Sequence, residues 1–434
     1  MKQLNTKMMH PADQLSLIIG RIYRGGLTTT SGGNLSIKDE NGDIWITPAG
    51  IDKGSLTAKD IVCVKPDGTV IGPHRPSSEL PFHKAIYDMR PKMHSVIHAH
   101  PPGLVTFSVI HQIPDTSILP QARTVCGPIG FAPYDVPGSL ALGDKIAAEF
   151  RKNPDYKAVI MENHGVVLCG EDIGDAYQRF ETLELCARTI INAKSLGKPK
   201  YLTEEQILML EQHIPQFQHY MNVSHPSEER LLRQEICRIV RRACDQKLMS
   251  SSYGTVSMRW KGNDFLITPT GVQRWDIDEE DIVQVKDGMV EAGKHPSRAT
   301  ALHYEIYQKN PDVGAIILTQ CPSLMGFCTT DAPFNVRTIP ETWIFLQDVP
   351  RFPYGSQYNE PAKVAEAFKD RPCALIENDS VVVAADSIIN AFDRLEVAEF
   401  AAKSLILAQG MGDLHPITDK EIEDLAVAFH VGGR

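Results

Sequence analysis

The sequence contains no Cys-x-x-Cys pair, although it has nine cysteines, an odd number. Disulfide frameworks in secreted domains and thiolate zinc sites both depend on evenly paired or closely spaced cysteines. The pattern therefore favours reduced, mostly buried thiols in a reducing compartment. Any metal site in this chain must then be built from histidine and carboxylate side chains.

Long apolar runs and an excess of basic residues are absent too. No stretch of about 18 apolar residues, as a membrane-spanning helix needs, occurs in the sequence, and residues 1–9 contain no long apolar segment. Lys and Arg number 44 against 54 Asp and Glu, which gives a net charge of −10. We therefore predict a cytoplasmic protein with no membrane and no nucleic-acid partner; a local basic pocket for a small anion stays compatible with this charge.

The length of 434 residues exceeds what one hydrophobic core usually supports, and the chain carries an internal repeat. Two copies are displaced by about 220 residues, so that Ile-Thr-Pro-Ala-Gly-Ile at 46–51 recurs as Ile-Thr-Pro-Thr-Gly-Val at 267–272. A period this long indicates tandem domains rather than a solenoid. We predict a first domain over residues 1–222 and a second over residues 223–434.

Each copy alternates helical and strand patterns. In the first copy, residues 11–24 carry apolar side chains at helical spacing. The other elements expected there are helices over about 78–89, from the turn at 137–138 to about 151 and over 174–196, and strands ending near 100 and covering 158–162 and 166–169. This alternation predicts an α/β/α layered domain with one central sheet, and it leaves open which strands are parallel.

Two histidines stand at the end of a predicted buried strand. The run Ser95-Val96-Ile97 is largely β-branched, and Pro101-Pro102 closes the segment. Side chains at positions i and i+2 of a strand point to the same face, so His98 and His100 are expected side by side. Two neutral imidazoles are half of a zinc site, whereas an isolated His-x-His is also typical of ordinary buried histidines.

Two further residues of the first copy favour a metal site. His164 lies at a predicted strand end, where Gly165 is expected to let the chain turn and to leave the imidazole accessible. Glu79 lies at the predicted start of a helix, where its carboxylate either faces the histidines or only stabilises the helix N-terminus. Three imidazoles leave an open position on a zinc ion, and a nearby carboxylate can act as ligand or base.

Together these motifs resemble those of the class II aldolase and adducin family, over nearly the whole chain. The motifs that carry the resemblance, in the family's order and approximate spacing, are Ser31-Gly32-Gly33-Asn34-Leu35-Ser36, Ile46-Thr47-Pro48-Ala49-Gly50, Pro76-Ser77-Ser78-Glu79, His98-Ala99-His100, Ala132-Pro133-Tyr134 and Asn163-His164-Gly165. The resemblance implies two tandem three-layer α/β/α domains of class II aldolase type, each with a central mixed or mainly antiparallel sheet.

The resemblance also implies roles for the site residues. His98, His100 and His164 would bind Zn²⁺, and Glu79 would be the catalytic acid/base that also contacts the metal when no substrate is present. Other divalent transition metals stay alternatives, because imidazole and carboxylate ligands bind them as well. Epimerases of the family have aspartate where this chain has Glu79, which favours carbon–carbon bond chemistry.

A phosphate site is the second element expected in the first copy. The groups expected to hold the phosphate are Gly33, Asn34, Ala49, Gly50, Ser77 and Ser78. They combine Gly-rich turns with hydroxyls at a helix N-terminus, although each short stretch alone is typical of a turn or cap. In the family these stretches bind the substrate phosphate. Ala49 stands where aldolases of the family have threonine, so one hydroxyl contact is missing.

The second copy has lost the expected metal ligands. The counterparts of His98, His100, His164 and Glu79 are Leu318, Gln320, Asp379 and Ala299, and those of Asn34, Ser77 and Ser78 are Thr255, Ser297 and Arg298. The second copy is therefore expected to bind no catalytic zinc. It keeps Tyr354 opposite Tyr134, and the resemblance implies that a tyrosine at this position donates a proton in a neighbouring active site. We predict that Tyr354 serves the active first copy; the alternative is an ordinary half-buried strand-end tyrosine.

The leading interpretation is a zinc-dependent aldolase that cleaves a ketose 1-phosphate to dihydroxyacetone phosphate and an aldehyde. A decarboxylase, dehydratase or epimerase acting on a related sugar phosphate is an alternative with similar chemistry, and an adducin-like, non-catalytic scaffold is an alternative from another class. Single-copy members of the family resemble four-fold rings. Two fused copies per chain could form the same ring from two chains, which predicts a homodimer with pseudo-four-fold symmetry.

Overall fold

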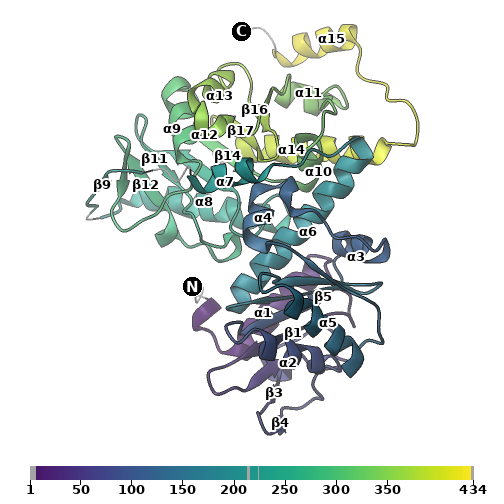
Figure 1. Cartoon of the computed structure of the whole chain (residues 1–434). Helices are drawn as coiled ribbons and strands as arrows, with labels where there is room; N and C mark the ends of the chain where they lie inside the picture. Colours follow the sequence, from purple (N-terminus) through teal and green to yellow (C-terminus); the bar gives the residue numbers. More distant parts are fainter. Residues whose placement is uncertain (1–5, 213–215, 223, 432–434) are drawn as a thin grey trace. The chain divides into compact units, whose positions relative to one another are not determined.

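The computed structural model describes residues 6–212, 216–222 and 224–431 (Figure 1). The chain forms two compact units. The first contains the residues up to Arg188 except Ser117–Pro120, and the second contains Ser117–Pro120 and the residues from Thr189 onward. The domain boundary expected at residues 222 and 223 stays a prediction, and residue 223 lies outside the described residues.

In the described part of the first unit, eight strands form one sheet in the order β4-β3-β2-β1-β5-β8-β7-β6. The strands are β1 (Asn34–Lys38), β2 (Ile44–Ile46), β3 (Val62–Val64), β4 (Val70–Ile71), β5 (Ser95–Ala99), β6 (Gly130–Ala132), β7 (Ala158–Met161) and β8 (Gly165–Gly170). All neighbours are antiparallel except β6 and β7. The sheet is therefore mixed and mainly antiparallel, as the family resemblance implies.

The four helices predicted for the first copy are present to within a few residues. They are α1 (Pro11–Arg24), α2 (Leu80–Met89), α5 (Leu140–Lys152) and α6 (Ile173–Leu196). Two further helices, α3 (Pro102–Val109) and α4 (Pro120–Cys126), were not predicted from the sequence pattern. Helix α1 has the predicted bounds, because Pro11 opens its first turn and the side chain of His10 accepts a hydrogen bond from the amide of Ala12. Its apolar face, which includes Leu15 and Ile19, is fully buried.

Helices cover both faces of the first sheet. On one face, Val96 and Val167 pack in a core with Phe82 of α2 and Phe150 of α5. The neighbouring residue Ile97 is also fully buried but points to the opposite face, where α1 contacts β1 and α3 contacts β8 (Figure 1). The first unit therefore has the predicted three-layer α/β/α architecture.

The strands described in the second unit form one sheet in the order β15-β16-β17-β14-β10-β11-β12-β13-β9. They are β9 (His219–Tyr220), β10 (Thr255–Arg259), β11 (Phe265–Ile267), β12 (Val283–Lys286), β13 (Met289–Glu291), β14 (Ala315–Thr319), β15 (Arg351–Phe352), β16 (Cys373–Ile376) and β17 (Ser380–Ala385). Only the β9–β13 and β15–β16 pairs among them are parallel.

The second sheet is flanked by helices in the same manner. Its unit contains α7 (Glu204–Gln212), α8 (Ser227–Asp245), α9 (Thr300–Lys309), α10 (Pro322–Cys328), α11 (Pro340–Leu346), α12 (Ser356–Asn359), α13 (Pro361–Ala367), α14 (Ile388–Ala408) and α15 (Asp419–Phe429). Helices α9 and α13 contribute to the core on one face, while α8 contacts β10 and α14 contacts β14 and β17. The fold therefore repeats along the chain.

A buried hydrogen-bond triad recurs in both units and relates them residue by residue. In the first unit, the Ser36 hydroxyl lies 2.7 Å from Nδ1 of His83 and 2.7 Å from the hydroxyl of Tyr87. In the second unit, the Ser257 hydroxyl lies 2.7 Å from Nδ1 of His303 and 2.8 Å from the hydroxyl of Tyr307. The first triad joins β1 to α2, and the second joins β10 to α9. The repeat is therefore one of side-chain contacts as well as of backbone.

The His303 imidazole is expected to make the second unit sensitive to acid. Burial lowers its pKa to about 3, and its Nε2 has no hydrogen-bond partner in the described part of the chain. The unfolded chain binds the proton near pH 6.5, so the free energy of unfolding decreases as pH falls from about 6.5 toward 3, by roughly 1.4 kcal/mol per pH unit.

Urea unfolding of wild type and of His303→Gln, compared at pH 7, 6 and 5, tests this expectation. The substitution should lower the free energy of unfolding of the second unit at pH 7. It should also make that free energy depend less on pH than in the wild type. Parallel pH profiles for the two proteins would contradict it.

All nine cysteines are buried, as the sequence predicts, and none of those in the described residues forms a disulfide. A search of the described residues finds no helix with both the length and the apolar character needed to span a bilayer.

Candidate metal centre

Three imidazoles converge at one end of the first sheet. His98 is the fourth residue of β5, His100 follows the strand, and His164 lies in the turn between β7 and β8. Because β8 pairs with β5, the turn lies beside the end of β5. The ring centroid of His98 lies 4.8 Å from that of His100 and 4.8 Å from that of His164. Each of the three residues has one ring nitrogen that lies within 4.8 Å of a ring nitrogen of the other two.

Hydrogen bonding fixes which nitrogen of His98 faces the cluster. Nδ1 of His98 lies 2.9 Å from the carbonyl oxygen of Val166, to which it donates its proton. Nε2 is therefore the nitrogen with the lone pair, and it lies 3.0 Å from Nε2 of His100. Two ring nitrogens this close together either share a proton in a hydrogen bond or bind the same cation.

The protonation state of the cluster suits a metal ion. Burial lowers the pKa of His98 to about 3 and that of His164 to about 4, and the nearness of the other imidazoles lowers the pKa of His164 further. Burial lowers the pKa of His100 as well. All three imidazoles are thus neutral near pH 7, and the neutral ring is the form that binds a metal.

The Glu79 carboxylate faces the same cluster. Glu79 occupies the N-cap position of α2 without a side-chain capping hydrogen bond, and it is 8% exposed. Its Oε2 lies 3.3 Å from Nε2 of His98, and its Oε1 lies 3.6 Å from Nε2 of His164. Oε1 is buried without a hydrogen-bond partner in the described residues. Three neutral imidazoles and an unpaired carboxylate oxygen are a donor set that fits a divalent transition-metal ion.

Asn34 orients this carboxylate, which the sequence alone did not indicate. Its side-chain nitrogen donates to Oε2 of Glu79 at 2.5 Å, while its oxygen lies 2.5 Å from Nε2 of His83. In the second unit Thr255 and Ala299 occupy the positions of Asn34 and Glu79, and Nε2 of His303 has no partner among the described atoms. The second copy has lost Asn34 and Glu79 together, and this joint loss is the signal in the sequence from which the contact could have been inferred.

The residues expected to hold a phosphate lie on loops that meet beside the cluster. Pro48 and Pro76 form an isolated β-bridge, which brings the loop with Ala49 and Gly50 against the loop that precedes α2. Gly50 has φ +70° and open space where a side chain would start. The amide of Ala49, however, already donates to the carbonyl of Arg75 at 3.0 Å.

The other expected phosphate groups differ in accessibility. Gly33 has φ +74°, and a Cβ there would lie 2.9 Å from the carbonyl oxygen of His98, so the turn brings the backbone close to the cluster. Ser77 is buried and its hydroxyl accepts from the amide of Glu79, whereas Ser78 is exposed. The side chain of Asn34 is hydrogen-bonded to Glu79 and His83, so in the described structure it faces the histidine cluster and not the loops expected to hold a phosphate.

The expectation that Gly165 makes the turn at His164 is wrong. Asn163 has the positive φ, +51°, and so makes the turn. Gly165 is needed for space instead, because a Cβ there would lie 2.6 Å from the carbonyl oxygen of Ala99 and 2.8 Å from the ring of His100. Asn378 repeats the positive φ in the second unit.

The two tyrosines have different surroundings within their own units. Tyr134 is 52% exposed, and its amide donates to Oε2 of Glu162 at 2.7 Å. Tyr354 lies in the second unit, half-buried, with a hydroxyl that has no hydrogen-bond partner among the described residues. Its proposed role therefore stays a prediction.

The register of the second sheet confirms the alignment of the two copies. Thr255 pairs with Leu318 where Asn34 pairs with His98 in the first sheet. Within the described part of the chain, the cluster of His98, His100 and His164 is the one group of histidine, cysteine and carboxylate side chains that could hold a metal ion.

Comparison with known proteins agrees with this geometry. The family model described as the class II aldolase and adducin N-terminal domain matches residues 14–191 and again residues 234–406. The 5-deoxy-D-ribulose 1-phosphate aldolase of Bacillus thuringiensis serovar kurstaki is 34% identical over 191 residues, covering 43% of this chain and 87% of the relative. The 3-oxo-tetronate 4-phosphate decarboxylase of Haemophilus influenzae is 29% identical over 203 residues, covering 46% and 95%.

A solved structure of an L-fuculose 1-phosphate aldolase is 27% identical, with a TM-score of 0.42, and covers 46% of this chain and 94% of that one. Each of these proteins spans about half of the present chain, as expected of relatives with a single copy. The two matches of the family model account for the internal repeat. The chain therefore belongs to the class II aldolase and adducin family and carries two of its domains in tandem.

Proposed function

We propose that the first unit is a zinc-dependent aldolase that cleaves a ketose 1-phosphate to dihydroxyacetone phosphate and an aldehyde. The observation that carries the proposal is the convergence of three neutral imidazoles on one point with the Glu79 carboxylate beside them. The name of one relative, 5-deoxy-D-ribulose 1-phosphate aldolase, supports the substrate class.

The reaction needs proton transfers that the residues of this chain can supply. When the C3–C4 bond of the substrate breaks, the C4 hydroxyl loses its proton, the aldehyde forms, and the electron pair remains on C3. Glu79 would deliver a proton to C3, and in the reverse direction would remove it. A divalent ion held by the three imidazoles would supply positive charge that stabilises the negative charge developing on the substrate oxygens.

Other groups would bind and orient the substrate. The loops at Gly33, Gly50 and Ser77 would hold the phosphate, because turn amides and the N-terminus of α2 favour an anion there. Asn34 would keep the Glu79 carboxylate directed at the reacting carbon through its 2.5 Å hydrogen bond. The site thus divides into an anion end and a reaction end.

Decarboxylation of a phosphorylated keto-acid is the second candidate. It is favoured by the relative named 3-oxo-tetronate 4-phosphate decarboxylase, which aligns over 95% of its length. Loss of carbon dioxide also leaves an electron pair on carbon beside a carbonyl group. The same positive charge and the same carbon-directed acid would therefore serve both reactions.

A substrate screen with the zinc-loaded full chain tests the two candidates. L-Fuculose 1-phosphate, 5-deoxy-D-ribulose 1-phosphate and 3-oxo-tetronate 4-phosphate would be supplied separately, and release of dihydroxyacetone phosphate and of carbon dioxide followed. Dihydroxyacetone phosphate from a ketose 1-phosphate supports the aldolase, and carbon dioxide from the keto-acid supports the decarboxylase. Release of neither product, from metal-loaded protein that binds phosphate, would contradict both.

We propose Tyr354 as a proton donor or acceptor for the substrate hydroxyl, with Tyr134 as the competing residue. A tyrosine hydroxyl contributes roughly 100-fold or more when it transfers a proton in the rate-limiting step. Tyr354→Phe is therefore expected to lower kcat about 100-fold with little change in metal content. If Tyr354→Phe turns over normally while Tyr134→Phe does not, the role belongs to Tyr134.

A homodimer is the proposed assembly, since two chains with two domains each would supply four copies of the fold. Size-exclusion chromatography with light scattering measures this directly. A mass of 48.2 kDa, that of one chain, would contradict the proposal.

A further inference from the structure

The second unit contains a pocket at the place where the metal centre has been lost. Leu318, Gln320 and Asp379, which stand where the first copy has its three histidines, all line it. Its volume is about 80 Å³. A water molecule needs only about 10–15 Å³ on this scale, so the pocket has room for a small organic ligand or several waters. Loss of the imidazoles has thus not filled the space with apolar side chains.

One side of the pocket is built like an anion site. Gly254 and Gly271 have φ +95° and +74°, so both loops keep the tight turns of the first copy. The hydroxyls of Thr255 and Ser297 lie 2.6 Å apart and both residues line the pocket, Ser297 just before the ten-residue helix α9. Turn amides, hydroxyls and a helix N-terminus are the groups that bind phosphate in proteins.

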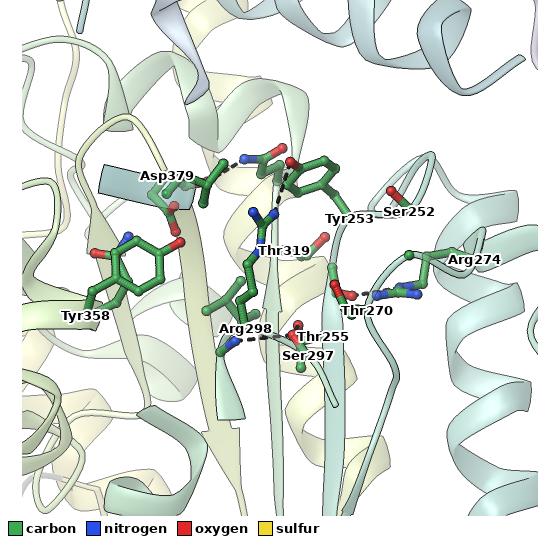
Figure 2. Close-up of a pocket in the computed structure, with 17 residues that line it drawn as sticks. Ser252, Tyr253, Thr255, Thr270, Arg274, Ser297, Arg298, Thr319, Tyr358 and Asp379 are labelled. Carbon is green, nitrogen blue, oxygen red and sulfur yellow. Dashed lines mark hydrogen bonds between the residues drawn. The ribbon is translucent and has the colours of Figure 1, made fainter. Parts of the chain in front are cut away.

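Two arginines lie at the pocket: Arg298 adds a positive charge that the first copy lacks, and Arg274 replaces Lys53 of the first copy. Arg298, in place of Ser78, lines the pocket, and one of its nitrogens donates to the hydroxyl of Tyr253 at 3.2 Å. Figure 2 shows its side chain between Tyr358 and Asp379 on one side and Thr270 on the other. A guanidinium has five N–H groups, so most of its donors stay available to a ligand.

Arg274 lies beneath the two turns. It is 2% exposed and donates to the carbonyl oxygens of Gly254, Pro269 and Val272, which ties the loops together and leaves its charge next to the pocket. The two arginines outnumber the one carboxylate, Asp379, that lines the pocket. The charge of the lining therefore favours an anion.

An unsatisfied side chain points independently to a ligand. Gln357 lines the pocket and is 3% exposed, yet neither its amide oxygen nor its amide nitrogen has a hydrogen-bond partner of normal geometry in the described structure. Burial raises the pKa of the Asp379 carboxyl, and the Gln357 amide, which lies beside Asp379 and Tyr358, lowers it. These contacts of Gln357 lack normal hydrogen-bond geometry, and a bound hydroxylated molecule would give the buried amide full hydrogen bonds.

We propose that this pocket binds a small phosphorylated polyol or sugar without a metal ion. The phosphate lies on the side of Thr255, Thr270 and Ser297, and Arg298 donates to it. The hydroxyl groups of the ligand lie toward Gln357 and Asp379, where a carboxylate would repel a phosphate but accepts hydrogen bonds from hydroxyls. The second unit is then a ligand-binding domain, and this assignment does not depend on which reaction the first unit catalyses.

Hydrogen exchange of the full chain, with glycerol 3-phosphate as the probe and glycerol as the uncharged control, tests the proposal. Bound probe is expected to slow exchange in peptides covering residues 252–255 and 297–300 of the second unit, and glycerol at the same concentration is expected not to. The peptides covering residues 31–36 and 76–80 report separately on the first unit. No slowing in the second unit at saturating probe would overturn the proposal, whatever the first unit does.

A matched pair of variants identifies the arginine. Arg298→Ala is expected to weaken the affinity of the second unit roughly 10- to 100-fold, as loss of a charge-assisted hydrogen bond would, and Arg298→Lys less. Arg238→Ala removes an arginine of the same unit that is exposed and paired with Glu235, and should leave the affinity unchanged. Equal affinity in Arg298→Ala and wild type, with both folded, would overturn the assigned phosphate contact.

The outcomes separate this proposal from the proposed function. Slower exchange in the second unit with no activity in the substrate screen would support the ligand-binding pocket and contradict the aldolase proposal. Activity together with slower exchange in the first unit, but unchanged exchange in the second, would support the aldolase proposal and contradict the ligand-binding pocket.

Discussion

Replacing His98 by alanine is expected to abolish stoichiometric zinc binding and to lower turnover by roughly 1,000-fold or more. The side chain is fully buried, and its Nε2 lies 3.0 Å from that of His100 and 3.3 Å from Oε2 of Glu79. Its removal leaves two imidazoles and a cavity in the middle of the donor set. A bound ion contributes several kcal/mol to charge stabilisation in the transition state, and each 1.36 kcal/mol is tenfold in rate.

The measurement is metal content per chain by mass spectrometry of the eluted ions, beside kcat/KM for the substrate found in the screen. Wild type is expected to hold about one ion per chain in the first unit, because a site of three imidazoles binds one ion. Dialysis against a chelator should remove the ion and the activity together, and added zinc should restore both.

His94→Ala is the matched control. His94 lies just before β5, the strand that carries His98, and is exposed, with Nδ1 3.4 Å from the carbonyl oxygen of Lys38. Its loss should change neither metal content nor rate. A His98→Ala protein that keeps one ion per chain and full activity, or a wild type that turns over without any ion, would show that the histidine cluster is not the catalytic metal site.

The sequence predicts those parts of the site that depend on local periodicity. His98 and His100 lie side by side because the period of a strand is two, and two prolines end the strand directly after them. The position of Glu79 at the start of α2 follows from the apolar spacing of the helix behind it. In each case the determining interactions lie within a few residues along the chain.

Contacts between distant segments could not be predicted in this way. Asn34 contacts Glu79 across 45 residues because β1 and β5 pair in a register that puts it opposite His98. Position 165 must be glycine because the backbone there lies close to the His100 ring. The local sequence does not reveal this contact and suggested a turn instead. Strand order and direction, including the single parallel pair of the first sheet, are likewise set by packing between elements.

The same reasoning applies to the second copy. Four substitutions predict that the second copy lacks the metal ligands expected in the first, but they do not predict the pocket that stands there. Gln357 comes from α12 and has no counterpart among the motifs of the first copy, whereas Arg274 takes the place of the buried Lys53 of the first copy. A pocket lined from seven separate segments of the chain becomes visible only when the chain is folded.

Glu79→Gln is expected to separate metal binding from proton transfer. The amide has the shape of the carboxylate and can still accept the hydrogen bond from Asn34, but it cannot take up and release a proton near neutral pH. Because the three imidazoles remain, zinc content should stay near that of wild type. Loss of a general acid/base typically lowers the rate roughly 100- to 10,000-fold, so kcat should fall by a factor in that range.

Exchange of a carbon-bound hydrogen reports this step without the full reaction. In deuterium oxide, the wild type should exchange one C3 hydrogen of dihydroxyacetone phosphate for deuterium, observed by proton NMR, since Glu79 removes it in the reverse direction. Glu79→Gln should bind the same molecule without exchange, and Glu171→Gln, a change at an exposed carboxylate of the same unit, should exchange at the wild-type rate. Wild-type exchange in Glu79→Gln would assign the proton transfer to another group, whereas loss of zinc together with exchange would make Glu79 a ligand rather than the acid/base.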